Sequence, residues 1–282
     1  MSPPEVPVPD LPTRRLGRTG LDVVAVGLGA MDTPHSPDAA ATVHAAIDLG
    51  MNFIDTAREY AGSEYLLGQV IRVRGCLDFH VSTKTFSHTA DGAQRDVDRS
   101  LSVLGVEAID LYQLHDVSSL EAWAAVMDED HGALTGLRIA QFRGLVRHIG
   151  VSTHNLDVLR LIIESDAFDT VMVDYSAFVP ESAALIAEAA ARDVGVIVMR
   201  PMGGSGRTSI MRGEIARGEV GLVTPARLLC HVLSHPGVSV AIPGARHPSR
   251  VRENLETLAG FVPMPEADQR ALEAAARAFD EA

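Results

Sequence analysis

Lysine is almost absent from this sequence. Of its 24 basic residues, 23 are arginine and one is lysine, Lys84. An ammonium group can exchange a proton or form a Schiff base, whereas a guanidinium does neither at ordinary pH. We therefore interpret Lys84 as a functional residue at a position that arginine cannot fill, rather than as a surface charge that survived by chance.

Cysteine, long apolar runs and positive net charge are also scarce. Two cysteines, Cys76 and Cys230, cannot build a disulfide framework or a four-thiolate metal site, so we expect plain thiols. The nearly apolar stretches 23–31 and 194–199 fall far short of the roughly 20 residues that a bilayer span requires. A net charge of −13 repels a phosphate backbone. We expect neither a membrane nor a nucleic acid as partner.

The first 15 residues have no apolar core between a basic start and a cleavage site, which predicts a cytoplasmic location. Hydrophobic residues make up 46% of the chain and charged residues 22%, values typical of a globular protein. A chain of 282 residues has the length of one α/β barrel. We predict a single domain over residues 1–282.

Short β-rich apolar runs alternate along the chain with longer amphipathic stretches. The runs occupy residues 22–27, 52–55, 77–84, 108–115, 145–152, 170–175, 195–200 and 238–244. Eight such units at a period near 35 residues predict a (β/α)8 TIM barrel. An open doubly wound sheet also alternates strands and helices, but the nucleotide-binding turn GxGxxG is absent. Residues 265–282 predict an extra C-terminal helix on the outside of the barrel.

Polar side chains stand where several predicted strands end. Asp55, Lys84, His115 and Ser152 follow the second, third, fourth and fifth runs, and the chemistry of a TIM barrel lies at the C-terminal ends of its strands. Tyr60, five residues after Asp55, can return over the barrel mouth. If Asp55 pairs with Lys84, the ammonium group favours the phenolate and lowers the Tyr60 pKa. The sequence thus predicts a tyrosine acid at the mouth.

At this point the sequence resembles the aldo-keto reductase family over nearly its whole length. The motifs that carry the resemblance are RRLGRTGLDVVAVGLGAM (14–31), NFIDTAREYAGSEYLLGQVI (52–71), VSTK (81–84), DLYQLH (110–115), IGVSTHN (149–155) and IPGARHPSRVRENL (242–255). The resemblance implies a catalytic tetrad of Asp55, Tyr60, Lys84 and His115. In it, nicotinamide delivers hydride to a carbonyl carbon, Tyr60 supplies the proton, Lys84 and Asp55 tune Tyr60, and His115 orients and polarises the carbonyl.

The resemblance also implies a nicotinamide cofactor, NADP(H) with NAD(H) as the alternative, and a small carbonyl or alcohol substrate. Ser152 and Thr153 stand where the family holds the nicotinamide amide with a Ser-Asn pair, and Met199 and Arg200 stand near its aromatic platform. The adenosine phosphate end falls on 242–254, where we expect contributions from Gly244, Arg246, Arg250, Glu253 and Asn254. A helix N-terminus with an arginine suits a 2′-phosphate. The loop 202–207, with Gly203 and Arg207, is placed to wrap the pyrophosphate.

Two other functions remain open for such a barrel. A lone lysine near a carboxylate and a tyrosine also suits a Schiff-base aldolase. A barrel that binds nicotinamide as a redox sensor, with little turnover, is the second alternative. We expect no metal: HVLSH (231–235) has two histidines four residues apart, but no glutamate follows the first and no third ligand is evident.

Overall fold

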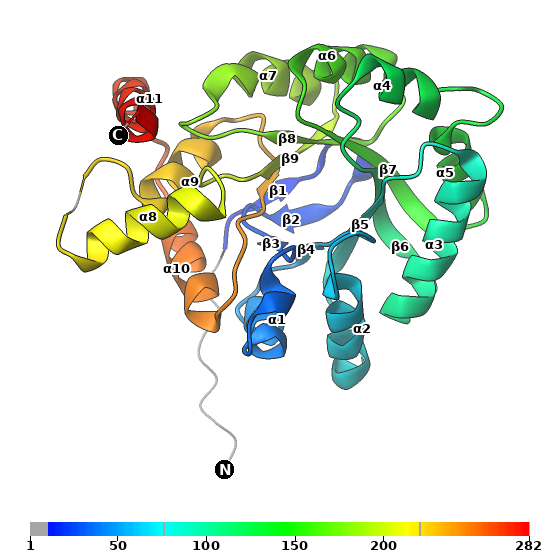
Figure 1. Cartoon of the computed structure of the whole chain (residues 1–282), viewed down its shortest axis with the longest axis horizontal. Helices are drawn as coiled ribbons and strands as arrows, with labels where there is room; N and C mark the ends of the chain where they lie inside the picture. Colours follow the sequence, from blue (N-terminus) through cyan, green and yellow to red (C-terminus); the bar gives the residue numbers. More distant parts are fainter. Residues whose placement is uncertain (1–10, 76, 220, 282) are drawn as a thin grey trace.

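Eight parallel strands curl around the centre of the molecule, and helices surround them (Figure 1). The computed structural model describes residues 11–75, 77–219 and 221–281. The strands follow one another in chain order around the sheet. They are β3 (Leu28–Gly29), β4 (Phe53–Asp55), β5 (His80–Thr85), β6 (Ile109–Leu114), β7 (Val146–Thr153), β8 (Thr170–Asp174), β9 (Gly195–Met199) and β10 (Val240–Ala241).

Parallel bridges join the first strand to the last. Val26 pairs with Ala241 and Gly29 with Gly244, so the sheet closes on itself. Side chains of alternate strands fill the interior, among them Phe53, Leu111 and Met172, which are almost completely buried. The predicted (β/α)8 barrel is confirmed.

A short hairpin closes the N-terminal end of the barrel. It consists of β1 (Thr13–Arg15) and β2 (Asp22–Val24), which pair antiparallel, and its side chains Leu16 and Val23 are fully buried against the barrel interior. The prediction that residues 22–27 form the first barrel strand is therefore wrong in its first half. The start of the apolar run forms β2 of the hairpin that closes the barrel, and only its end, at Val26, pairs with β10.

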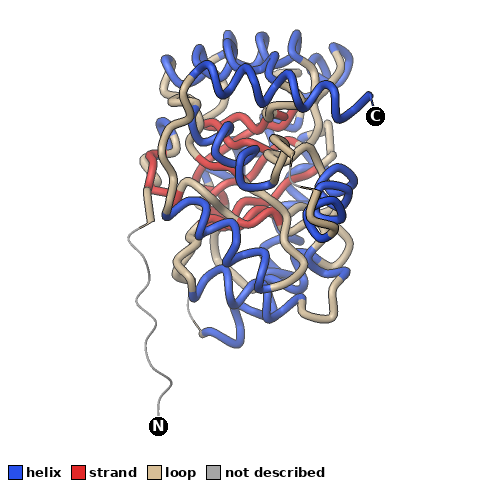
Figure 2. Tube along the Cα trace, turned by 90° about the vertical axis from the view of Figure 1, so that its left-hand side faces the viewer, coloured by secondary structure: helices blue, strands red, loops and turns tan. Residues whose placement is uncertain are grey.

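Helices cover the outside of the strands, as Figure 2 shows. They are α1 (Ala39–Asp48), α2 (Ser63–Arg74), α3 (Ala90–Leu104), α4 (Leu120–Val126), α5 (Ala133–Phe142), α6 (Leu156–Ser165), α7 (Ala183–Ala191), α8 (Ser205–Ala216), α9 (Pro225–Ser234), α10 (Pro248–Ala259) and α11 (Glu266–Glu281). Helix α8 is an addition between β9 and α9 that the sequence analysis does not anticipate, because Met211 is its one buried residue among those described.

The predicted C-terminal helix is confirmed as α11. It buries Leu272 and Ala276, and His231 of α9 makes a 2.9 Å hydrogen bond to Glu273. None of the helices in the described part of the chain is long and apolar enough to cross a membrane.

Candidate active site

Three neighbouring strands bring Asp55, Lys84 and His115 to the C-terminal end of the barrel. Asp55 is the last residue of β4 and pairs in register with Ser82 of β5. Lys84 lies near the end of β5, and His115 directly follows β6. The chain order of strands in a closed parallel sheet makes these ends adjacent, which is why residues about 30 apart in sequence meet here.

Asp55 and Lys84 form a buried ion pair. The Lys84 Nζ lies 2.5 Å from Asp55 Oδ2 and donates a second hydrogen bond, of 2.8 Å, to the Thr56 carbonyl. Asp55 Oδ1 accepts from Ser82 Oγ at 2.9 Å. Lys84 has no exposed surface, and burial lowers its pKa, although the Asp55 carboxylate opposes that shift. The ion pair thus lies beneath the barrel mouth, and both of its side chains are shielded from solvent.

Tyr60 lies between this ion pair and His115. The Lys84 Nζ is 4.9 Å from the centre of the Tyr60 ring, and the Tyr60 hydroxyl lies 3.5 Å from His115 Nε2. The two rings meet edge to face at 5.4 Å. The four side chains predicted for the tetrad therefore form a continuous series of neighbours, from Asp55 through Lys84 and Tyr60 to His115.

The Tyr60 pKa is raised, not lowered, so that part of the sequence prediction is wrong. Burial is the main cause, and the carboxylates of Asp55 and Glu59 add to it, whereas Arg200 opposes it. The expected effect of Lys84 is absent because Asp55 neutralises the ammonium group at 2.5 Å. Tyr60 accordingly holds its proton firmly at neutral pH and is suited to donate it only to a strong base, such as a developing alkoxide.

The residues predicted to hold the nicotinamide end lie on β7 and just after β9. Ser152 and Thr153 are buried; Ser152 Oγ accepts from the Asp116 N–H at 2.8 Å, and Thr153 Oγ1 accepts from the Asn155 N–H at 3.1 Å. Arg200 follows β9 with a left-handed backbone (φ 49°) and is well exposed. It lies 3.7 Å from the Asp174 carboxylate.

The residues predicted for the adenosine phosphate end gather around the start of α10. Arg250 contacts Glu253 at 2.8 Å, and Arg212 of α8 contacts the same carboxylate at 2.7 Å. Arg246 lies 3.3 Å from Asp32. Asn254 is buried. A Cβ built on Gly244 meets no atom closer than 3.7 Å, so the surface beside this glycine is open. Arg246 and Arg250 flank the N-terminus of α10, a position that suits a phosphate group, although each is paired with a carboxylate here.

Arg207 is engaged elsewhere. Its guanidinium makes two 2.6 Å hydrogen bonds to Asp280 of α11 and one of 2.9 Å to the Gly203 carbonyl, and it stacks on the Phe178 ring at 4.6 Å. The structure thus brings Gly203 and Arg207 together, but toward the C-terminal helix rather than toward Arg250.

Four contributors to the site escaped the sequence analysis. Glu59 contacts His115 Nδ1 at 3.3 Å, Phe86 stacks on the His115 ring, Asp174 pairs with His154 and Arg200, and Arg212 joins Glu253. Asp174 is the second-last residue of the predicted run 170–175 and the last residue of β8, a signal that could have found it. The other three stand in loops or in the unpredicted α8.

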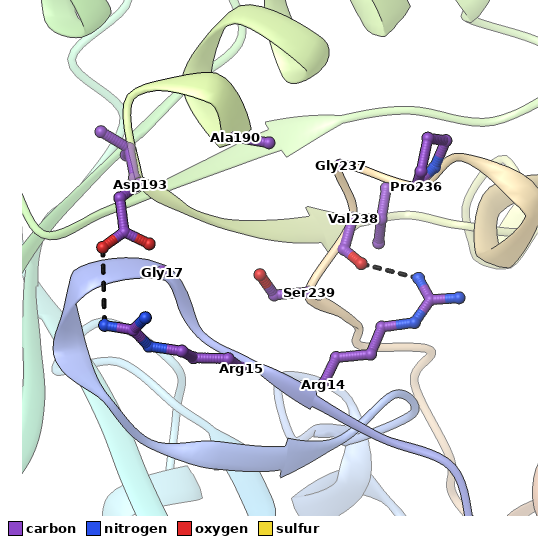
Figure 3. A pocket seen from close by; sticks show the side chains of 10 residues that line it. Arg14, Arg15, Gly17, Ala190, Asp193, Pro236, Gly237, Val238 and Ser239 are labelled. Atoms are coloured by element: carbon purple, nitrogen blue, oxygen red, sulfur yellow. Dashed lines mark hydrogen bonds and ion pairs between the residues drawn. The ribbon is translucent and has the colours of Figure 1, made fainter.

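A cavity of about 430 Å³ lies at the other end of the barrel (Figure 3). Its lining includes Arg14 in β1, Asp193 before β9 and Ser239 before β10. Arg14 is tied there to the carbonyls of Val238 and Leu233 at 2.6 and 2.7 Å. The cavity is therefore distinct from the mouth where the tetrad residues gather.

Within the described ranges, no three His, Cys, Asp or Glu side chains are grouped so that they could hold a metal ion. His231 and His235 instead bond Glu273 and the Ala183 carbonyl. Cys230 is a free thiol whose pKa burial raises. The prediction for Cys76 lies outside the described residues.

Comparison with known proteins identifies the family. The model of the aldo/keto reductase family matches residues 25–221. An aldo-keto reductase of Mycobacterium sp. (strain MCS) is 30% identical over 250 residues, which cover 84% of this chain and 82% of that protein. The chain belongs to the aldo/keto reductase family. Membership makes it an NAD(P)H-dependent oxidoreductase, and the Schiff-base aldolase is not favoured.

Other relatives agree with this assignment. L-galactose dehydrogenase of Arabidopsis thaliana is 33% identical over 169 residues, which span 54% of this reductase and 51% of the plant enzyme. Among solved structures, an aldo-keto reductase of Bacillus halodurans superposes with a TM-score of 0.76 over 94% of this chain and 96% of its own, at 21% identity. One from Klebsiella pneumoniae in complex with NADPH gives 0.73 over 93% and 94%, at 24% identity. Both likenesses concern the fold.

Proposed function

We propose that this aldo-keto reductase transfers hydride between NADP(H) and a small carbonyl or alcohol substrate, with Tyr60 as general acid and base. The observation that carries the proposal is the convergence of Asp55, Lys84, Tyr60 and His115 at one end of the barrel. Bound nicotinamide supplies the hydride. The chain's own residues supply the proton and the electrostatic environment.

The proton comes from Tyr60. Its hydroxyl is the acidic group that stands above the Asp55–Lys84 pair and beside His115. As the carbonyl oxygen becomes an alkoxide, its basicity rises above that of the phenolate, and the proton passes to it. The phenolate that remains lies beside the Asp55–Lys84 pair, with the Lys84 Nζ 4.9 Å from the ring centre.

His115 orients the substrate oxygen. Its Nε2 lies next to the Tyr60 hydroxyl, so one carbonyl oxygen can contact both groups. A preorganised donor aimed at developing negative charge stabilises the transition state more than the substrate.

The cofactor preference rests on the arginines around α10. Arg246 and Arg250 flank the helix N-terminus that follows the open surface at Gly244, and Arg212 shares Glu253 with Arg250. This arrangement supports binding of a 2′-phosphate and hence NADP(H) over NAD(H). We place Ser152, Thr153 and Arg200 at the nicotinamide end and Glu253 and Asn254 at the adenosine end. Gly203 and Arg207 can reach the pyrophosphate if Arg207 releases Asp280.

The test is a screen of NADPH consumption against aldehydes, ketones, aldoses and quinones, run with wild type and Tyr60→Phe. We expect one or more substrates with wild type and a loss of about 10²–10⁴-fold in kcat/KM with Tyr60→Phe, because general acid catalysis contributes about that much. NADPH affinity, measured by fluorescence quenching, should change little. A Tyr60→Phe enzyme within about tenfold of wild type would show that Tyr60 is not the acid.

The redox-sensing alternative predicts NADPH binding with no useful turnover of any compound in this panel. A cytoplasmic location stays a prediction, and fractionation of cells that produce the protein tests it.

A further inference from the structure

His115 is held on both sides by groups outside the predicted tetrad. Glu59 Oε2 lies 3.3 Å from His115 Nδ1, and the Phe86 ring stacks on the imidazole with centroids 4.1 Å apart and planes 14° apart. Glu59 Oε1 accepts from the Phe86 N–H at 3.3 Å. The Glu59 carboxylate therefore links the loop after β4 to Phe86, directly after β5, and to His115, directly after β6.

The Glu59 carboxylate is ionised at neutral pH. Burial raises its pKa, but the hydrogen bonds from His115 and from the Phe86 N–H outweigh burial and lower it overall. An ionised carboxylate has acceptor atoms only. The hydrogen between Glu59 and His115 must then reside on Nδ1, in the neutral ring as in the charged one.

This constraint decides what the other ring nitrogen can do. A neutral histidine carries one hydrogen, so with Nδ1 occupied its Nε2 is bare and only accepts. In that state Nε2 can receive the Tyr60 hydroxyl, 3.5 Å away, but it cannot donate to a substrate oxygen. Donation from Nε2 requires the doubly protonated imidazolium.

Resting on the function proposed above, we propose that Glu59 is a positioning residue that keeps the hydrogen of His115 on Nδ1, so that His115 polarises a carbonyl only as an imidazolium. The negative charge of Glu59 stabilises that cation. The other charged groups around the ring are the Asp55–Lys84 pair beneath Tyr60 and Arg200, which acts on Tyr60 from the end of β9. Asp55 balances Lys84, which leaves Glu59 as the carboxylate in direct contact with the imidazole.

The first experiment needs neither cofactor nor substrate. Imidazole ¹⁵N NMR on the labelled protein, with the His115 signals assigned by their loss in His115→Asn, reports which nitrogen carries the hydrogen when the ring is neutral. We expect the Nδ1–H form in wild type and a shift toward the Nε2–H form in Glu59→Gln, whose amide can turn its NH2 group toward Nδ1. Glu188→Gln is the control, because Glu188 lies on α7 and pairs with Arg192 at the C-cap of that helix.

The second experiment measures kcat/KM for carbonyl reduction against pH. If donation from Nε2 needs the doubly protonated ring, the profile of wild type has an alkaline limb, and Glu59→Gln should move this limb to lower pH because it removes the adjacent negative charge. Glu188→Gln should leave it in place.

An Nε2–H tautomer in wild type, or an unchanged tautomer in a folded Glu59→Gln protein, overturns the role of Glu59. An unchanged pH limb in that variant does the same. Because the NMR result is independent of turnover, it decides the role of Glu59 even if the NADPH screen finds no substrate and the proposed function fails. Circular dichroism of Glu59→Gln verifies that the variant is folded.

Discussion

Substitutions at Lys84 can distinguish the role of its positive charge from a role of its amine as a nucleophile. Its ammonium group is fully buried and has Asp55 and the Thr56 carbonyl as partners. Lys84→Arg keeps the charge and removes the amine nucleophile, whereas Lys84→Met removes both. For a reductase we expect Lys84→Arg to retain measurable NADPH-dependent reduction above Lys84→Met, measured as kcat/KM on the best substrate of the screen.

Lys84→Met should also destabilise the fold. It leaves the Asp55 carboxylate buried without its counter-ion, a change that typically costs about 3–5 kcal/mol in the free energy of unfolding. Urea denaturation measures the loss, and Asp55→Asn combined with Lys84→Met should recover part of it without recovering activity. Equal inactivity of the two single variants, together with a borohydride-trapped adduct on Lys84 in wild type, would contradict the reductase chemistry.

The raised pKa of Tyr60 predicts how kcat/KM for carbonyl reduction depends on pH. Because burial and the neighbouring carboxylates raise this pKa, Tyr60 stays protonated throughout the neutral and mildly alkaline range. Carbonyl reduction therefore loses nothing to ionisation of Tyr60 there. In His115→Gln we expect a slower enzyme whose kcat/KM for reduction is flat with pH up to about 9, near the ordinary range of free tyrosine. A persistent alkaline limb in that variant would assign the limb to Tyr60 instead.

At the scale of elements, helices α2 and α3 approach closely at a glycine. A Cβ on Gly68 of α2 would lie 2.3 Å from the Val103 carbonyl oxygen of α3. We expect Gly68→Ala to lower the free energy of unfolding by about 1–3 kcal/mol, because the two backbones must separate. Gly206→Ala on α8 is the matched control, since nothing lies within 4 Å of its Cβ position. There alanine should be neutral or stabilising by up to about 1 kcal/mol, and urea denaturation compares the two.

We expect the start of α10 to decide the choice between cofactors. Arg250 pairs with Glu253 but remains partly exposed. Its exposed guanidinium nitrogens are available to a phosphate. We expect Arg250→Ala to weaken NADPH binding by roughly 1.5–3 kcal/mol, the range for hydrogen bonds to charged groups, and to leave NADH binding nearly unchanged. Fluorescence titration measures both affinities. Equal losses for the two cofactors would show that Arg250 does not contact the 2′-phosphate.

At the scale of the whole molecule, closure of the barrel couples the two ends of the chain. The bridges of Val26 to Ala241 and Gly29 to Gly244 join the two edges of the sheet. The bonds from Arg14 to the carbonyls of Leu233 and Val238 join the N-terminal hairpin to the segment from α9 to β10. The single domain over residues 1–282 stays a prediction. Differential scanning calorimetry should give one transition with equal calorimetric and van't Hoff enthalpies. Two separated transitions would indicate two domains.

The amino-acid sequence by itself determined the architecture and placed Asp55, Lys84 and His115 at the ends of consecutive strands. Alternating apolar runs and amphipathic stretches are local signals, and the C-terminal ends of consecutive strands in a barrel are neighbours by topology. Asp55, Lys84 and His115 could therefore be assigned to one site without coordinates. The hairpin at β2 and helix α8 could not, because an apolar run does not reveal its pairing partner and α8 buries little.

Tertiary structure alone decided the electrostatics of the site. The Tyr60 pKa depends on burial and on how closely Asp55 neutralises Lys84, and neither is encoded in spacing along the chain. The contact between Glu59 and His115 joins residues 56 positions apart. Likewise, the ion pair between Arg207 and Asp280 depends on where α11 packs against the barrel. Side-chain partners across the fold set charge and proton positions, because electrostatic interactions depend on distances in space and on exclusion of water.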